Sequence, residues 1–152
     1  MLIGRPIRLI IPSRSTKRAN RVAARKKKRN KMENRIFWVD CEMTGLDYMG
    51  KDKIMEFASV VTDGDLNVIK EGPEFVVHIS DADLGAMDEW CTRTHGQTGL
   101  TEKCRNSKDT ISQWDEKVAQ FIRDNCPKAP IAGNSVHMDL NFMRKGKYCT
   151  CI

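Results

Sequence analysis

The sequence predicts an α/β fold, in which a mixed sheet is flanked by helices. Three observations support this prediction: an apolar strand over 36–39, a hairpin turn at 63–64, and helical spacing of apolar side chains from Thr110. In chain order the segments form strand, strand, strand, helix, strand and helix, an arrangement typical of α/β proteins. A chain of 152 residues is long enough for one domain with a substantial hydrophobic core.

Charge is distributed unevenly along the chain. Residues 1–32 contain 12 Lys and Arg residues and no acidic residue, whereas residues 33–152 contain 14 basic and 20 acidic residues. We therefore divide the chain into a basic N-terminal extension over 1–33, a domain over 34–143 and a divergent basic tail over 144–152. No apolar run approaches the roughly 18 residues needed to cross a bilayer, so we expect a soluble protein without a membrane partner. The six cysteines include no C-x-x-C pair, and we expect reduced intracellular thiols.

The basic extension has three alternative interpretations. Arg residues among Ser, Ala and aliphatic side chains, without any acid, match a mitochondrial transit peptide, although Pro6 and Pro12 interrupt an amphipathic helix. The cluster Arg-Lys-Lys-Lys-Arg over 25–29 is also typical of a nuclear-localisation or nucleic-acid-binding patch. The third alternative is a disordered, solvated segment. A nuclear or cytoplasmic location therefore stays open beside a mitochondrial one.

Two carboxylates follow the first predicted strand. The apolar run over 36–39 indicates a strand buried on both faces, and Asp40 and Glu42 come directly after it. Side chains two positions apart on an extended chain point to the same face, so these carboxylates lie side by side. A hard divalent cation such as Mg²⁺ relieves their repulsion, because it takes oxygen ligands. The pair is therefore either a metal site or a solvated strand terminus.

The second strand and its hairpin follow from alternation and turn chemistry. Apolar side chains alternate over 54–62, which indicates a strand. The Asp-Gly pair at 63–64 is a hairpin signal, so we expect the chain to return antiparallel over 66–70 and to continue over 75–79. Glu56 stands among the apolar side chains of the second strand. It is either a structural, hydrogen-bonded carboxyl or a group that approaches the candidate metal site.

Helix signals occupy the next part of the chain. Ser80, with an acid three residues on, is a capping pattern for a short helix that runs towards Trp90. The segment 94–100 contains two glycines, and we expect it to form a turn. From Thr110 apolar side chains recur at helical spacing, until Pro127 ends the helix.

The last predicted helix follows a short strand over 131–132 and a tight turn. Ser135 is its expected N-cap. Asp139 lies in the first turns, where backbone dipoles favour a negative charge by about 0.3–1 kcal/mol. The positions expected to face inward are Val136, Leu140 and Met143.

Five blocks of sequence are specific enough to suggest a family. The first reads Asp-Cys-Glu-Met-Thr-Gly-Leu-Asp over 40–47, and others begin at Asp52, Glu71, Met87 and Ile131. These blocks closely resemble the oligoribonucleases, a branch of the DEDD superfamily of 3′→5′ exonucleases. The resemblance implies the ribonuclease-H-like fold, here without its C-terminal strand and helices.

The resemblance also implies a reaction. Family members use two Mg²⁺ or Mn²⁺ ions to hydrolyse the terminal phosphodiester of short single-stranded oligoribonucleotides, releasing 5′-mononucleotides from the 3′ end. Asp139 aligns with the aspartate of the second motif, so the implied catalytic residues and metal ligands are Asp40, Glu42 and Asp139. Animal members are commonly mitochondrial, which favours that location. The family is homodimeric, but we regard dimerisation of this chain as doubtful.

Substrate contacts are implied by the same resemblance. They are Leu46, wedged between the terminal bases, Trp90, on which a base stacks, Ser135, at the terminal phosphate, and His95, in the same pocket. Stacking of this kind contributes about 1–3 kcal/mol and tolerates any base. Without the family, Leu46 and Trp90 would be expected in the core and His95 in a surface turn.

The third motif of the family has no counterpart in this sequence. That motif, H-x4-D, supplies the general-base histidine and the last metal-binding aspartate, whereas this chain resembles the family only to about Met143. His78 and Asp83 share the spacing, but they occupy a strand end and a helix start. Losing a general base typically lowers the rate by about 10²–10⁴. We expect an apparently truncated chain with impaired hydrolysis; the alternatives are a non-catalytic RNA-binding or dimerisation fragment and a structural ribonucleoprotein component.

Overall fold

A computed structural model describes residue 18 and the ranges 21–23 and 34–145. The chain divides into two units, Met1–Lys31 and Met32–Ile152. The described residues of the first unit are helical. The transit-peptide and nuclear-localisation interpretations fall almost wholly outside the described residues, as does the tail beyond Lys145. In the described part of the chain, no helix is long and apolar enough to span a bilayer.

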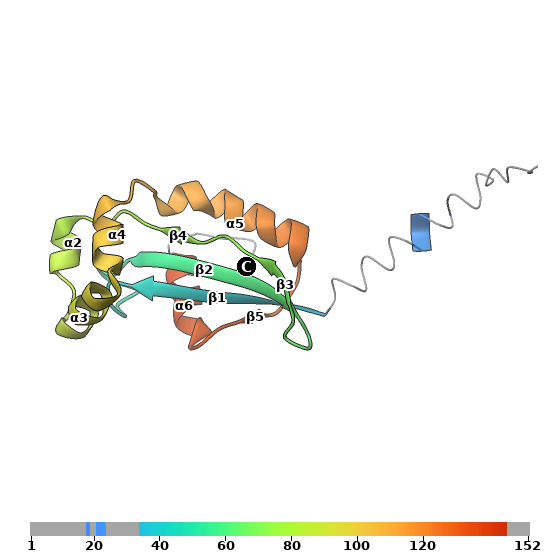
Figure 1. The fold of residues 1–152 in the computed structure, drawn as a ribbon, viewed down its shortest axis with the longest axis horizontal. Coiled ribbons are helices and arrows are strands. Elements are labelled where there is room, and N and C mark those ends of the chain that lie inside the picture. Colours follow the sequence, from blue (N-terminus) through green and yellow to red (C-terminus); the bar gives the residue numbers. More distant parts are fainter. Residues whose placement is uncertain (1–17, 19–20, 24–33, 146–152) are drawn as a thin grey trace, which may run out of the picture. The chain divides into compact units, whose positions relative to one another are not determined.

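The second unit is built on a five-stranded mixed sheet (Figure 1). At its centre is β1 (Arg35–Met43), which pairs antiparallel with β2 (Ile54–Asp63) and parallel with β5 (Ile131–Ala132). Both β3 (Val68–Glu71) and β4 (Phe75–Val76) pair antiparallel with β2. This arrangement confirms the predicted mixed sheet and the predicted return of the chain along the second strand.

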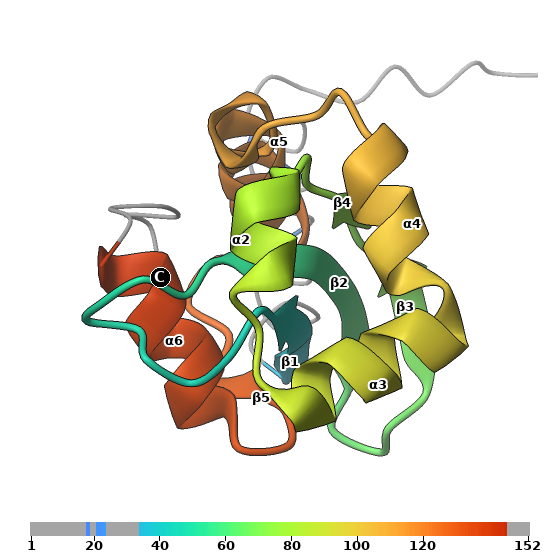
Figure 2. The same cartoon turned by 90° about the vertical axis from the view of Figure 1, so that its left-hand side faces the viewer.

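Five helices accompany the sheet within the described residues. They are α2 (Asp81–Gly85), α3 (Glu89–Thr98), α4 (Leu100–Asn106), α5 (Ile111–Asn125) and α6 (Val136–Lys145). Figure 2, which looks along the strands, shows α5 over one face of the sheet and α6 beside β1 and β5, and Figure 1 shows α2, α3 and α4 gathered at the end of the sheet where β1 ends. The predicted α/β class is therefore confirmed.

Capping residues define where these helices begin. The Ser80 hydroxyl accepts a hydrogen bond from the Asp83 N–H at the start of α2, as predicted. The carboxylate of Asp88 does the same for α3 by accepting from the Cys91 N–H. Thr110 begins α5 with a capping box. The single helix expected towards Trp90 is thus two helices, α2 and α3.

The turn expected over 94–100 is wrong. Residues up to Thr98 continue α3, and Gly96 lies inside that helix. Only Gly99 leaves the helical conformation, with a left-handed φ of 77°, and α4 begins directly after it. A glycine within a helix lowers its stability by only about 1 kcal/mol, which tertiary packing of α3 outweighs.

The core lies between one face of the sheet and α5. Phe37 and Val39 of β1 are buried there, whereas Trp38, between them, is half-buried on the other face. The expectation that this strand is buried on both faces is therefore only partly met. The rings of Phe57, Phe75 and Trp114 form a continuous stack with 5.1 Å between successive centroids. This stack fixes β4 and α5 against β2.

Helix α6 lacks its expected cap, and of the positions expected to face inward only Met143 is buried. Ser135 has a left-handed φ of 54°, unlike the extended N-cap, and its backbone carbonyl accepts a hydrogen bond from the Met138 N–H. The buried positions of this helix are Asp139, Phe142 and Met143. Val136 and Leu140 are half-buried. The helix therefore turns an acidic side chain towards the sheet.

Candidate active site

Asp40 and Glu42 project from one face of β1, as their spacing predicts. Both are exposed, whereas Cys41 between them is buried on the opposite face. Antiparallel pairing sets Ala58 of β2 opposite Asp40 and Glu56 opposite Glu42. Directly opposite residues share a face of the sheet, so Glu56 adds a further carboxyl beside Glu42.

Asp139 approaches the same stretch of β1 from α6. It is 3% exposed, and its Oδ1 accepts a 2.9 Å hydrogen bond from the backbone N–H of Cys41. The close approach of α6 depends on Gly133, because a Cβ there would lie 2.3 Å from the carbonyl oxygen of Val39. The structure thus brings Asp139 to the residue that separates Asp40 from Glu42.

The carboxylates perturb one another. Burial raises the pKa of Glu42, His95 opposes this rise, and the charges of Asp40, Glu56 and Asp139 add to it. Burial also raises the pKa of Asp139; the hydrogen bonds from Cys41 oppose that rise, and the charge of Asp40 adds to it. Burial is the main cause of both shifts and the neighbouring carboxylates add to them, so a bound cation would relieve both the loss of solvation and the repulsion.

His95 is held rigidly beside this cluster. It is 2% exposed within α3, so the surface turn expected from local sequence is wrong. Its Nε2 lies 3.0 Å from the carbonyl oxygen of Met43, and that nitrogen must carry the proton because a carbonyl only accepts. The other ring nitrogen, Nδ1, lies 3.9 Å from Oε2 of Glu42. The imidazole therefore links α3 to the end of β1.

A cavity of about 570 Å³ opens over these groups. Of the residues singled out by sequence, its lining includes Asp40, Glu42, Leu46, Trp90, His95 and Ser135. Asp139 is absent from the lining but contacts Cys41, which belongs to it. Leu46 is 70% exposed and Trp90 is 59% exposed, so the expectation that they are core residues is wrong.

The donor atoms of the cluster suit a hard cation, but the cluster is not assembled around one. In the described part of the chain, no three His, Cys, Asp or Glu side chains are arranged so that they could hold a metal ion together. All three carboxyls supply oxygen, the ligand type that Mg²⁺ and Mn²⁺ prefer. Asp40 and Glu42 are exposed, whereas Asp139 is buried.

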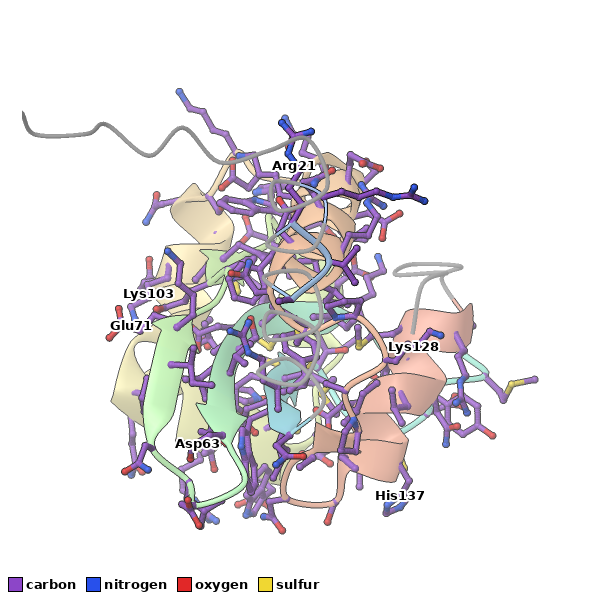
Figure 3. The ribbon with its side chains drawn as sticks, turned by 90° about the vertical axis from the view of Figure 1, so that its right-hand side faces the viewer. Arg21, Asp63, Glu71, Lys103, Lys128 and His137 are labelled. Atoms are coloured by element: carbon purple, nitrogen blue, oxygen red, sulfur yellow. The ribbon has the colours of Figure 1, made fainter. Side chains whose placement is uncertain are left out.

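The remaining two histidines lie away from this cavity. His78 lines a separate cavity of about 360 Å³ with Lys53 and Lys145. Asp83, which shares its H-x4-D spacing, forms an ion pair with Lys53. His137 is exposed on α6 (Figure 3). His95 is thus the single histidine in the lining of the candidate site.

The family model RNase_T, described as exonuclease, matches residues 37–147. The chain belongs to this exonuclease family. It is 47% identical over 118 residues to a probable oligoribonuclease of Dictyostelium discoideum, covering 76% of this chain and 62% of the relative. It is 43% identical over 116 residues to the mitochondrial oligoribonuclease of Homo sapiens, covering 75% and 48%. The resemblance to oligoribonucleases is confirmed, and the chain spans about half to two thirds of the length of these relatives.

A solved exonuclease structure has the same fold. The crystal structure of E. coli Exonuclease I in complex with a dT13 oligonucleotide matches with a TM-score of 0.57 and 23% identity. The match covers 74% of this chain and 23% of that chain. The likeness confirms the expected ribonuclease-H-like arrangement of sheet and helices.

Proposed function

We propose that this chain is a 3′→5′ exoribonuclease that hydrolyses short single-stranded oligoribonucleotides to 5′-mononucleotides with Mg²⁺ or Mn²⁺. The observation that carries the proposal is the hydrogen bond from the Cys41 N–H to Asp139, which holds this carboxyl beside the stretch of β1 that supplies Asp40 and Glu42 to the cavity lining. Relatives named oligoribonuclease support the choice of substrate.

The carboxylates would hold the cations. Asp40, Glu42 and Asp139 are the proposed ligands for two ions, which when bound supply an activated water and stabilise the leaving 3′-oxygen. Hard oxygen donors support this assignment, as do the burial and the neighbouring carboxylates that together raise the pKa of Glu42.

The other residues of the cavity would bind the substrate. The exposed apolar side chains of Leu46 and Trp90 offer surfaces to unstacked bases, whose stacking contributes about 1–3 kcal/mol. Ser135 would contact the terminal phosphate, and His95 would complete the pocket wall. A domain with more acidic than basic residues does not suit a long phosphate backbone, which needs many cations.

Turnover by a polypeptide of these 152 residues is proposed to be slow. We do not assign His95 as the general base, because it is 2% exposed and its Nδ1 faces the Glu42 carboxylate, one of the proposed metal ligands. Without such a base we expect a rate lower by about 10²–10⁴. The second candidate function, oligoribonucleotide binding without hydrolysis, is favoured by the lack of a preassembled metal-holding trio in the described residues.

A dinucleotide assay distinguishes the two functions. The chain is incubated with a labelled ribodinucleotide and Mn²⁺, beside an EDTA control and the variants Asp40→Ala and Asp139→Asn, while calorimetry measures Mn²⁺ binding. Mononucleotide release that requires Mn²⁺ and both carboxylates supports the exonuclease. Dinucleotide binding without metal-dependent release supports the binding function and refutes the proposed reaction.

Location and assembly are part of the proposal. Mitochondrial location is supported by the basic extension over 1–33 and by mammalian relatives named mitochondrial, although other relatives carry no such name. Imaging of a tagged full chain tests it, with a chain lacking 1–31 as control. Dimerisation remains doubtful, and light scattering measures it directly.

A further inference from the structure

The loop between β1 and β2 presents Leu46 to the candidate cavity. We propose that Asp52, acting with Thr44, is a positioning residue that holds Leu46 in the cavity wall and thereby sets the affinity for the terminal nucleotides of the substrate. This inference rests on the proposed function, since it concerns the site where the oligoribonucleotide would bind.

The carboxylate of Asp52 spans the position of Leu46. Its Oδ1 accepts a 3.0 Å hydrogen bond from the Thr44 hydroxyl, two residues before Leu46. Its Oδ2 accepts a 2.9 Å hydrogen bond from the Asp47 N–H, one residue after Leu46. One side chain therefore bonds to residues on both sides of Leu46, the Thr44 hydroxyl and the Asp47 N–H, while the Leu46 side chain itself stays 70% exposed.

Thr44 completes this closure from inside the protein. It is 4% exposed, and its hydroxyl also accepts a 3.0 Å hydrogen bond from the Lys53 N–H. The backbone N–H of Thr44 donates to the Lys53 carbonyl at 3.0 Å. Three hydrogen bonds of Thr44 thus join the two ends of the loop, two of them to Lys53 and one to Asp52.

Gly45 allows the carboxylate to lie against the turn. A Cβ at this position would lie 2.4 Å from Oδ2 of Asp52 and within 3 Å of its other carboxyl atoms. Thr44, Gly45 and Asp47 therefore all contact the Asp52 carboxyl. The turn that carries Leu46 therefore packs closely around the Asp52 carboxyl group.

Other contacts connect the same loop to the elements that bound the cavity. The Tyr48 ring packs edge-on against Phe142 of α6, with 6.3 Å between centroids. Lys51 donates a 2.8 Å hydrogen bond to the carbonyl of Ala86, in the connection that leads to the helix of Trp90. The loop that carries Leu46 is therefore bonded to the segment that precedes the helix of Trp90.

The closure orders the loop, but the folded state alone does not require that an exposed leucine be held in one position. An exposed leucine contributes little to stability, because its apolar surface stays in water. When the leucine is already fixed before the ligand binds, binding loses less conformational entropy, and the affinity is higher. The base of a short oligonucleotide, unstacked and apolar on its faces, is the chemistry that this leucine fits.

Binding measurements on matched variants test the inference. A labelled, phosphorothioate-linked ribodinucleotide is titrated with the full chain and with Leu46→Ala, Asp52→Asn, Thr44→Val and Thr44→Ser. Asp63→Asn is the control, because the Asp63 carboxylate closes the β2–β3 turn in a similar way by accepting from the N–H groups of Asp65 and Asn67 (Figure 3). Thermal melting of each variant accompanies the titrations.

We expect Asp52→Asn and Thr44→Val to weaken dinucleotide binding about three- to tenfold, the range for losing the preordering of a single side chain, and Leu46→Ala to weaken it at least as much. Thr44→Ser, which keeps the hydroxyl, and Asp63→Asn are expected to stay within about twofold of the unmodified chain. Hydrogen exchange at the Asp47 amide is expected to accelerate in Asp52→Asn.

Three results would overturn the inference. One is unchanged affinity in folded Asp52→Asn and Thr44→Val while Leu46→Ala binds weakly, which leaves the proposed function intact. Another is equal weakening by Asp63→Asn, which would reveal a general loss of stability. The third is failure of the unmodified chain to bind any oligoribonucleotide, which overturns the proposed function too. If Asp52→Asn does not fold, the comparison of Thr44→Val with Thr44→Ser decides.

Discussion

Replacing Gly133 by alanine is expected to disturb both the fold and the candidate metal site. Gly133 follows β5, whose residues Ile131 and Ala132 pair with Phe37 and Trp38 of β1. An added Cβ would lie 2.3 Å from the backbone carbonyl oxygen of Val39, and distances under 3.0 Å essentially do not occur for real Cβ atoms. The chain after β5 must therefore move away from β1 by more than half an ångström.

The size of the effect follows from this displacement. Overpacking of a well-packed region costs about 1–3 kcal/mol. The same movement carries Asp139 away from the Cys41 N–H, whose present distance of 2.9 Å leaves little room for stretching before the hydrogen bond is lost. We expect Gly133→Ala to lower the free energy of unfolding by about 1–3 kcal/mol and to weaken Mn²⁺ binding.

Urea unfolding and calorimetry with Mn²⁺ measure the two effects. Gly96→Ala is a matched control, because a Cβ at Gly96 meets nothing within 4 Å and the residue lies inside α3. It is expected to stabilise the chain by about 0.5–1 kcal/mol through helix propensity. The reasoning is refuted if Gly133→Ala unfolds at the same urea concentration as the unmodified chain.

Three further outcomes are expected. Trp90→Ala weakens dinucleotide binding by about 1–3 kcal/mol in a polarisation titration but leaves the melting temperature nearly unchanged, because the indole is 59% exposed. Asp88→Ala lowers the melting temperature by removing the cap of α3. Hydrogen bonding to Cys91 lowers the pKa of Asp88 below 3.8, so the cap contributes its full stability above that pH and loses it as the pH falls through the lowered pKa. The melting temperatures of the two chains therefore converge in acid. Burial raises the pKa of the Cys91 thiol to about 11, so alkylation at pH 8, followed by mass spectrometry, proceeds far more slowly than in the urea-unfolded chain.

Local patterns in the sequence predicted most of the secondary structure. Alternation and the Asp-Gly turn located β2 and its return. The capping pattern at Ser80 located α2 and the helical spacing from Thr110 located α5, because these signals depend on neighbouring residues alone. The turn expected around Gly96 failed because a glycine interrupts a helix only when packing allows, and here α3 is held by its buried side chains, including His95.

The candidate site was predictable only in part. Asp40 and Glu42 lie two apart on one strand, so their proximity follows from strand geometry. The approach of Asp139 depends on the parallel pairing of β1 with β5, two strands that lie far apart in the sequence. Only the family resemblance indicated that Asp139 belongs to the site. Exposure of Leu46 and burial of His95 run against the usual preferences of these residue types, and no local pattern signals either.

The closure of the Leu46 loop also escaped sequence reasoning. In the sequence Asp52 only begins one of the blocks that resemble the family, whereas its contacts with Thr44 and Asp47 arise from the folded loop. Hydrogen-bonding side chains within a loop can pair in many ways, and the backbone path that selects one of them is set by the strands on either side.

The pairing of β5 with β1 involves only two residues of each strand, so the segment from β5 through α6 is separable in principle from the rest of the domain. Local opening of such a short pairing requires less free energy than global unfolding, and it would carry α6 and its aspartate away as a unit. The amide of Cys41, which donates to that aspartate, would then exchange its proton with solvent at a rate set by this opening. The rate of hydrogen–deuterium exchange at the Cys41 amide would therefore measure how often Asp139 separates from β1.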